Sequence, residues 1–100
     1  MVKMVVLYGH PADAAAFEDY YATTHVPLAE KIPDVRRFES GRVMPAQDGS
    51  APPYHRVAEL WFDSVESLQA ATDTPEGQAT VDDLPKFATG GVTLLVTDLD

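Results

Sequence analysis

A histidine on an apolar helix face is the strongest candidate for chemistry in this sequence. Phe17, Tyr20, Tyr21, Thr24 and His25 occupy positions i, i+3, i+4, i+7 and i+8. On a helix of 3.6 residues per turn these positions share one face, which we expect to turn toward the core. An imidazole at the end of that face can act as a general acid or base. The alternative is a core histidine whose ring nitrogens bond to nearby backbone.

A tyrosine one helical turn away strengthens the interpretation of His25 as a catalytic residue. Tyr21 and His25 can stack or share a hydrogen bond, and such a pair in an apolar pocket can move a proton on a small carbonyl or lactone substrate. The Val26-Pro27 pair predicts the end of the helix here. The negative helix end would raise the pKa of His25 and burial would lower it, so we expect a pKa near neutrality.

The histidines are not spaced as metal ligands. The sequence contains no His-x-x-x-His or Glu-x-x-His pair. We expect His25 at the same end of the sheet as Tyr54 and His55, with His10 at the opposite end, too far away to complete a metal site. There is no cysteine, which excludes disulfides, thiolate nucleophiles and cysteine-ligated metals. No phosphate-binding glycine motif is present, and we predict neither a metal nor another cofactor.

Composition limits the classes of partner. The 100 residues predict a single domain spanning 1–100, and the net charge of −9 argues against nucleic acids and anionic membranes. No apolar segment approaches the length of a membrane span, and the N-terminus lacks the features of a signal peptide. We therefore expect a cytoplasmic protein. The acidic pair Asp82-Asp83 is expected to be solvated.

The elements that position His25 follow the order β-α-β-β-α-β. Strands are predicted over 2–8, 35–43, 54–62 and 92–96. A first helix begins at the cap Asp13 and ends near Thr24, with a further short turn over 27–31. A second helix begins after Asp63, and Thr74-Pro75 restarts it. This order is the ferredoxin-like split βαβ plan, an α+β fold with a four-stranded antiparallel sheet.

The first and third strands are expected to lie centrally and to run parallel. Helices can cover only one face of their sheet, so a second copy is expected to cover the other face and form a homodimeric α+β barrel. Along the third strand, Ala58, Leu60 and Phe62 alternate with a set that includes Glu59 and Trp61. We assign the first set to the helix-packed core and Trp61 to the dimer interface. Glu59 is expected to face water or a polar lining between the sheets, with Arg37 and Glu39 as candidate neighbours, and a structural ion pair at the dimer interface is the favoured interpretation.

Several segments in order resemble the EthD family. They cover nearly the whole chain and are Leu7-Tyr8-Gly9, Phe17-Glu18-x-Tyr20-Tyr21-x-x-Thr24-His25-x-Pro27-Leu28-Ala29, Ala58-Glu59-Leu60-Trp61-Phe62-Asp63-Ser64, Thr74-Pro75-Glu76-Gly77 and Phe87-Ala88-Thr89-Gly90-Gly91. The resemblance implies a homodimeric α+β barrel and carries the motif histidine over to His25. The family is named for a small protein required alongside a cytochrome P450 system that degrades ethyl tert-butyl ether. Relatives sharing the barrel include lactone isomerases, cofactor-free monooxygenases, polyketide cyclases and haem-binding proteins.

Two functions from different classes follow. The first is a small enzyme, associated with oxidative degradation, that acts on an apolar metabolite with His25 and Tyr21 as catalytic residues. Tyr8, Phe17 and Tyr54 are the candidate substrate-binding residues. The second is a non-catalytic accessory protein that holds an intermediate for a partner oxygenase, and haem binding through His25 is a third option. A cavity beside His25 favours the enzyme, and a filled core favours the accessory protein.

Overall fold

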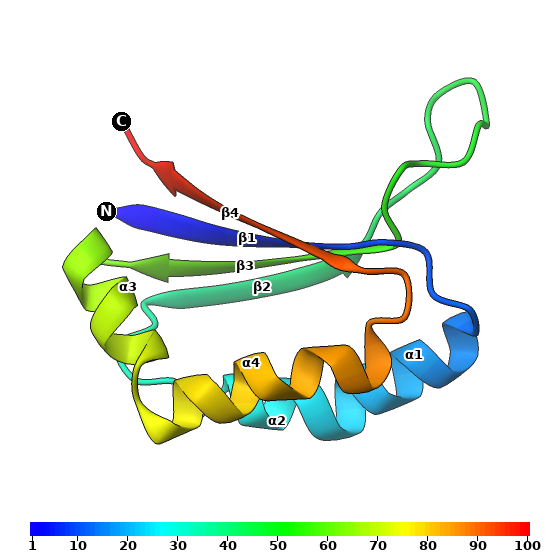
Figure 1. The fold of residues 1–100 in the computed structure, drawn as a ribbon. Coiled ribbons are helices and arrows are strands. Elements are labelled where there is room, and N and C mark those ends of the chain that lie inside the picture. Colours follow the sequence, from blue (N-terminus) through cyan, green and yellow to red (C-terminus); the bar gives the residue numbers. More distant parts are fainter.

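A four-stranded antiparallel sheet carries all of its helices on one face (Figure 1). The computed structural model describes residues 1–100. The strand order is β2-β3-β1-β4. The strands are β1 (Val2–Tyr8), β2 (Arg37–Arg42), β3 (Arg56–Phe62) and β4 (Val92–Asp98). The helices are α1 (Ala14–Tyr20), the π-helical turn η1 (Tyr21–His25), α2 (Val26–Ala29), α3 (Val65–Thr72) and α4 (Pro75–Phe87). This is the predicted ferredoxin-like order.

The two central strands run antiparallel, so the predicted parallel arrangement is wrong. Val2 of β1 pairs with Phe62 of β3, and Tyr8 pairs with Arg56. The physical reason is the connection after β2. The crossover through α1 leaves a gap between β1 and β2, and the chain then reverses and inserts β3 into that gap, antiparallel to both neighbours. The end of β1 and the beginning of β3 therefore lie at the same end of the sheet.

The first helical segment continues through the proline that was expected to end it. Asp13 caps α1 as predicted, because its side chain accepts a hydrogen bond from the Ala16 amide at 3.0 Å. The Val26 amide then bonds to the Tyr21 carbonyl five residues earlier, which defines the π turn η1. Pro27 sits in the first turn of α2, where its missing N–H is tolerated. The π turn is the local change that lets the helix pass Pro27.

Two side-chain caps shape the second helical segment. Ser64, one residue after the predicted Asp63, caps α3 by accepting from the Ser67 amide at 3.1 Å. Asp63 instead pairs with Arg36. Thr74 caps α4 by accepting from the Gly77 amide at 3.1 Å, as the Thr74-Pro75 pair predicts.

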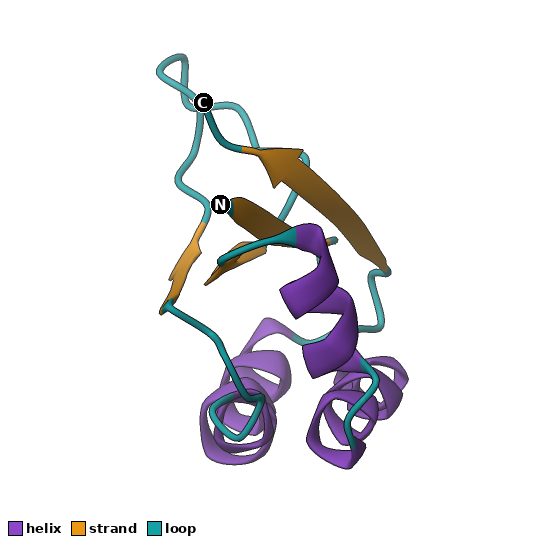
Figure 2. Ribbon diagram, turned by 90° about the vertical axis from the view of Figure 1, so that its left-hand side faces the viewer, coloured by secondary structure: helices purple, strands orange, loops and turns teal.

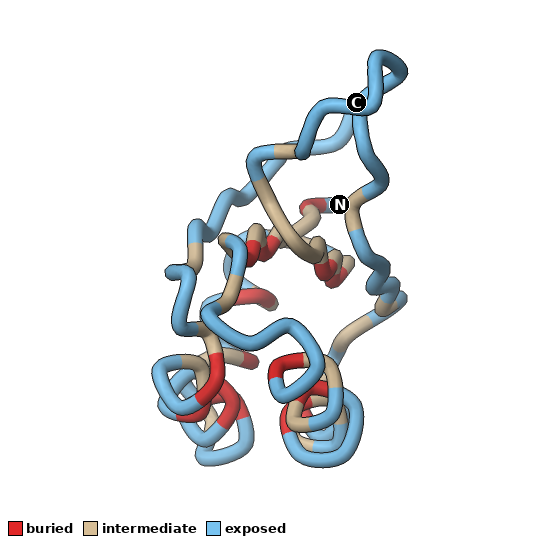
Figure 3. Tube along the Cα trace, turned by 90° about the vertical axis from the view of Figure 1, so that its right-hand side faces the viewer, coloured by how far each residue is buried: buried red, intermediate tan, exposed pale blue.

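The core lies between the sheet and the helices. Buried residues lie in the strands of the sheet and in the helices beneath it (Figure 3). Ala58, Leu60 and Phe62 are buried there, which confirms the predicted division of β3. The opposite face of the sheet has no helix over it (Figure 2). No helix is both long enough and apolar enough to span a membrane.

The outer face of the sheet is apolar with paired charges. Glu59 forms an ion pair with Lys3 at 2.9 Å, so an ion pair is present but its partner is Lys3 and not the expected neighbour Arg37. Trp61 lies on this face between the cations of Lys3 and Arg37, which approach its ring at 5.3 and 5.1 Å. Arg37 also pairs with Glu39. The side chains that could meet a second copy are therefore a tryptophan, aliphatic residues and neutralised charges.

Candidate functional site

A buried histidine–aspartate pair lies between the first and second helical segments. His25 ends η1 and Asp83 lies on α4, and their side chains are 5 % and 4 % exposed. His25 Nδ1 is 2.9 Å from Asp83 Oδ2, and Tyr20 donates its hydroxyl to Asp83 Oδ1 at 2.6 Å. The carboxylate therefore joins two residues of the first helical segment to α4. Both of its oxygens are occupied.

The charges of the pair are set by burial and by these bonds. Burial lowers the pKa of His25 below its ordinary value of 6.5, against the opposing effect of Asp83. Burial raises the pKa of Asp83, but hydrogen bonds from Tyr20 and His25 outweigh it and leave that pKa below its ordinary value. At neutral pH the pair is therefore a carboxylate and a neutral imidazole. Because a carboxylate only accepts, the imidazole proton sits on Nδ1.

The second ring nitrogen of His25 is free of protein partners, and the residue lines a cavity. Nε2 has no hydrogen-bond partner in the protein, and it is not fully enclosed, since no enclosed side-chain nitrogen or oxygen lacks a partner. The cavity has a volume of about 300 Å³ and lies between the sheet and the helices. Its lining is mostly apolar and comprises Met4, Val6, Tyr8, Tyr21, His25, Ala29, Ile32, Phe38, Ala58, Leu60, Thr72, Gly77, Gln78, Thr80, Val81, Leu84 and Leu94.

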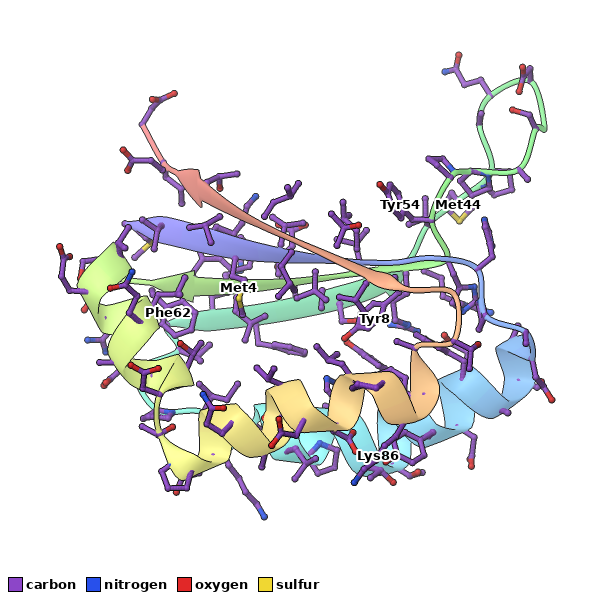
Figure 4. All side chains as sticks on the ribbon, in the orientation of Figure 1. Met4, Tyr8, Met44, Tyr54, Phe62 and Lys86 are labelled. Carbon is purple, nitrogen blue, oxygen red and sulfur yellow. The ribbon has the colours of Figure 1, made fainter.

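Aromatic rings form the wall on the His25 side. His25 contacts Phe87 with ring centroids 4.6 Å apart and Tyr21 at 5.8 Å. Tyr8 extends from β1 into the space between sheet and helices (Figure 4). Its ring meets Tyr21 and Phe87, each at 5.7 Å, and Phe17 at 5.4 Å. Tyr8 and His25 thus share two aromatic neighbours and line one cavity.

Tyr21 is held by a polar network that reaches the surface. Its hydroxyl lies 2.7 Å from Ser40 Oγ, and Arg56 donates to the same Ser40 oxygen at 2.9 Å. The Arg56 guanidinium also lies over the Tyr21 ring at 4.7 Å and bonds to Glu18. Burial raises the pKa of Tyr21, which keeps its hydroxyl protonated at neutral pH. Tyr21 is therefore fixed in the cavity wall.

The remaining candidate residues lie elsewhere. Phe17 packs behind the cavity, with its ring stacked on Tyr21 at 5.9 Å, and Tyr54 lies in the connection between β2 and β3. Neither lines the cavity. His10 and His55 lie at the same end of the sheet, with ring centroids 6.2 Å apart, and His55 bonds to Glu18 at 2.9 Å.

The predicted grouping of the histidines is therefore wrong. It placed His25 with Tyr54 and His55 and put His10 at the opposite end, because it assumed parallel central strands. The antiparallel pairing of β1 and β3 brings His10 and His55 together instead. The His, Asp and Glu side chains form no group of three or more that could hold a metal ion.

Asp83 is the residue that the sequence interpretation missed. The Asp82-Asp83 pair was expected to be solvated, but only Asp82 is exposed. The spacing of Thr80, Asp83 and Phe87 contains the missing signal, since these residues fall at i, i+3 and i+7 on one helix face and all three are buried. A carboxylate on a buried helix face needs a partner, which points to the histidine of the other helical segment.

The arrangement has the parts of a general base. A carboxylate orients the imidazole and fixes its tautomer, so that the free lone pair lies on Nε2 of a residue that lines the cavity. The lowered pKa of His25 keeps that lone pair available at neutral pH. No serine or threonine hydroxyl of the lining bonds to His25. The geometry therefore provides a base that can act directly on a bound molecule.

Comparisons with known proteins agree with this fold. Residues 9–91 match the EthD domain. An uncharacterized 11.0 kDa protein of the thcB–thcC intergenic region of Rhodococcus erythropolis is 43% identical over 98 residues, covering 98% of this chain and 94% of that protein. The crystal structure of an ethyl tert-butyl ether degradation (EthD) family protein from Bacillus halodurans has a TM-score of 0.93 and 37% identity, covering 100% of this chain and 99% of that one.

A more distant likeness concerns the fold alone. A dimeric ferredoxin-like protein of unknown function from Thermobifida fusca has a TM-score of 0.73 and 14% identity, covering 98% of this chain and 90% of that one. The domain match over residues 9–91 includes His25 and Asp83, and the two relatives cover 98% and 100% of this chain. The chain belongs to the EthD family.

Proposed function

We propose that this protein is a small enzyme that binds an apolar metabolite in the cavity and moves a proton on it with His25. The observation that carries the proposal is the orientation of His25. Its Nδ1 is bound to the buried carboxylate of Asp83, its Nε2 has no partner in the protein, and the residue lines an apolar cavity. We therefore place Nε2 against the bound molecule, because polar groups that serve only the core are bonded within the protein.

The size of the cavity limits the ligand. A volume of 300 Å³ is at the small end of ligand pockets. At about 30 Å³ per water-sized group it accommodates on the order of ten non-hydrogen atoms. Met4, Ile32 and Leu60 offer such a molecule apolar contacts away from the imidazole. The proposed ligand is therefore small and largely hydrocarbon, with a weakly acidic C–H bond near Nε2.

The chemical step needs no oxidant or reductant. Nε2 takes a proton from a carbon beside an electron-withdrawing group, and the electron pair of the broken C–H bond moves into that group. The imidazolium, stabilised by the Asp83 carboxylate, returns the proton to the same or another carbon. The net result is proton exchange or isomerisation. Tyr21 closes the wall beside the imidazole and restricts the orientation of the ring.

Deuterium exchange tests this proposal without knowledge of the natural substrate. A panel of small ketones and lactones is incubated with the protein in D₂O, and the loss of the α-proton signals is followed by NMR. We expect exchange that depends on the protein and that falls at least about a hundredfold in His25→Gln. His10→Gln is the matched control, since His10 is an exposed histidine bonded to the Pro52 carbonyl.

Two outcomes would contradict the proposal that the protein is an enzyme with His25 as its base. Equal exchange by His25→Gln and the unsubstituted protein would exclude His25 as the base. Tight binding with no exchange of any compound would favour the accessory role instead. We further propose that the activity serves degradation of an apolar metabolite, in line with the family name of the Bacillus halodurans relative.

We also propose a homodimer in which the outer sheet faces meet. Leu95 is 47 % exposed and pairs with Val5 across β1 and β4, on the face that no helix covers. The chain carries a net charge of −9, but Lys3 and Glu59 neutralise each other on this face. Two such faces can meet with little repulsion. Distant neighbours from Thermobifida fusca and Bacteroides fragilis are described as dimeric.

A further inference from the structure

The hydroxyl of Tyr8 has no partner within the protein. It appears in no hydrogen bond, although the residue is only 1 % exposed. Since no enclosed side-chain oxygen lacks a partner, the small exposed part of Tyr8 includes its hydroxyl, and the side chain lines the cavity. The other buried hydroxyls of the lining are occupied. Tyr21 bonds to Ser40, and Thr80 donates to the Glu76 carbonyl at 2.9 Å.

The ring of Tyr8 is fixed by its neighbours. It meets Phe17 and Tyr21 edge-on and packs obliquely on Phe87, so its hydroxyl cannot swing to a new partner without breaking those contacts. Burial raises the pKa of Tyr8 far above its ordinary value, so the group remains an O–H donor. It shares Phe87 and Tyr21 as neighbours with His25, and both residues line the same cavity.

From this geometry we infer that Tyr8 is a second catalytic residue, which donates to the oxygen of a carbonyl substrate while His25 acts on the adjacent carbon. This assigns the substrate class as small ketones, lactones or related carbonyl compounds, and it rests on the proposed proton transfer. When Nε2 removes the α-proton, the C–H electron pair forms a C=C bond and the carbonyl π electrons move to oxygen. The enolate oxygen then accepts a hydrogen bond from the Tyr8 hydroxyl. When the imidazolium returns the proton to carbon, the oxygen electron pair re-forms the carbonyl bond.

The same hydroxyl discriminates against hydrocarbons. A ligand without an acceptor would remove water from the Tyr8 donor and leave it unpaired, which costs binding free energy. A carbonyl oxygen accepts the hydrogen bond from Tyr8, while the rest of the molecule keeps the same apolar contacts as a hydrocarbon of that shape. The site is therefore selective for an oxygen at one end of an otherwise apolar molecule.

A matched pair of probes tests this selectivity. Acetophenone and α-methylstyrene have the same shape and differ only in a carbonyl oxygen against a methylene group. We expect the protein to bind acetophenone about tenfold more tightly, the effect of one hydrogen bond. Tyr8→Phe removes only the unpartnered hydroxyl and no intramolecular bond, so the variant is expected to fold and to bind both probes alike. Tyr54→Phe removes a tyrosine hydroxyl outside the cavity lining and is the control.

The kinetic readout is deuterium exchange into the acetophenone methyl group. We expect Tyr8→Phe to lower kcat about a hundredfold with a smaller change in KM, as loss of a donor to a developing oxyanion does. Equal binding of the two probes by the unsubstituted protein, failure of acetophenone to bind, or a ketone preference that survives in Tyr8→Phe would overturn the role of Tyr8. Absence of exchange in the unsubstituted protein, with the ketone preference intact, would instead overturn the proton transfer by His25.

Discussion

At the scale of single residues, burial rather than the helix dipole sets the state of His25. The sequence placed this histidine at a helix end, where the dipole would raise its pKa. In the structure the chain continues as a helix into α2, so His25 is not at a free helix end. Burial is then the largest influence, and the pKa of His25 falls. A neutral imidazole is a competent base at a pH where an exposed histidine is partly protonated.

Replacing the carboxylate partner tests the orientation of the base. Asp83→Asn retains the shape of the side chain but presents an amide that can donate to Nδ1, which would move the imidazole proton to Nε2. We expect the exchange rate to fall at least about a hundredfold while ketone binding changes little. The matched control is Asp82→Asn, because Asp82 is exposed on the same helix. A variant Asp83→Asn with full activity would exclude the orienting role.

The lowered pKa values predict how stability depends on pH. Below pH 6.5 the unfolded chain protonates His25 before the folded protein does, so the free energy of unfolding should fall as the pH drops below 6.5 toward the lower folded pKa. The lowered pKa of Asp83 likewise makes the free energy of unfolding fall as the pH drops below 3.8, the ordinary pKa of an aspartate. Urea titrations across this range should show the loss, and His25→Gln should lack the first phase. A flat profile between pH 7 and 5 in the unsubstituted protein would contradict the lowered pKa of His25.

In the buried His25–Asp83 pair, the histidine could be predicted from the sequence and the aspartate could not. His25 was recognisable because Phe17, Tyr21 and the histidine share a helix face. Asp83 stands beside a second aspartate in a polar segment, and its burial depends on how two helical segments pack, which local periodicity does not specify. The free hydroxyl of Tyr8 was equally hidden, since hydrogen-bond occupancy is a property of the packed structure.

At the scale of elements, side-chain caps were the most predictable features. Asp13 and Thr74 form the predicted hydrogen bonds, because a cap depends on residues only three positions apart. The π turn was not predicted, since it requires the chain to accommodate Pro27 within a packed helix. The direction of β3 was also missed, because it depends on the connection that precedes the strand and not on its own residues.

The cap at Thr74 predicts a measurable loss of stability. Thr74 Oγ1 accepts from the Gly77 amide and lies 2.6 Å from the Ala71 carbonyl, so it joins the end of α3 to the start of α4. We expect Thr74→Ala to lower the free energy of unfolding by about 1 kcal/mol. Thr74→Ser keeps the hydroxyl and should retain most of the free energy of unfolding that Thr74→Ala loses. Chemical denaturation measures both, and equal stability of the alanine and serine variants would show that the cap contributes nothing.

At the scale of the whole molecule, the uncovered sheet face predicts the oligomeric state. Light scattering at micromolar concentration should give about twice the chain mass of 10.9 kDa. Leu95→Glu would place a charge on the proposed interface, and we expect it to shift the protein to monomers. Val65→Glu, an equally exposed aliphatic site on α3, is the control and should remain dimeric. A monomeric unsubstituted protein would rule out this interface.

The cavity has a consequence for the folded state itself. A domain of 100 residues in which only 17 are buried leaves about 300 Å³ of its interior unfilled, so an occupant would complete the core as well as occupy a site. A ligand present at a hundred times its Kd adds about 2.7 kcal/mol to the free energy of unfolding. That is a large fraction of the stability of so small a protein. If the proposed metabolite binds in this cavity, the melting temperature of the protein would rise with the concentration of that metabolite.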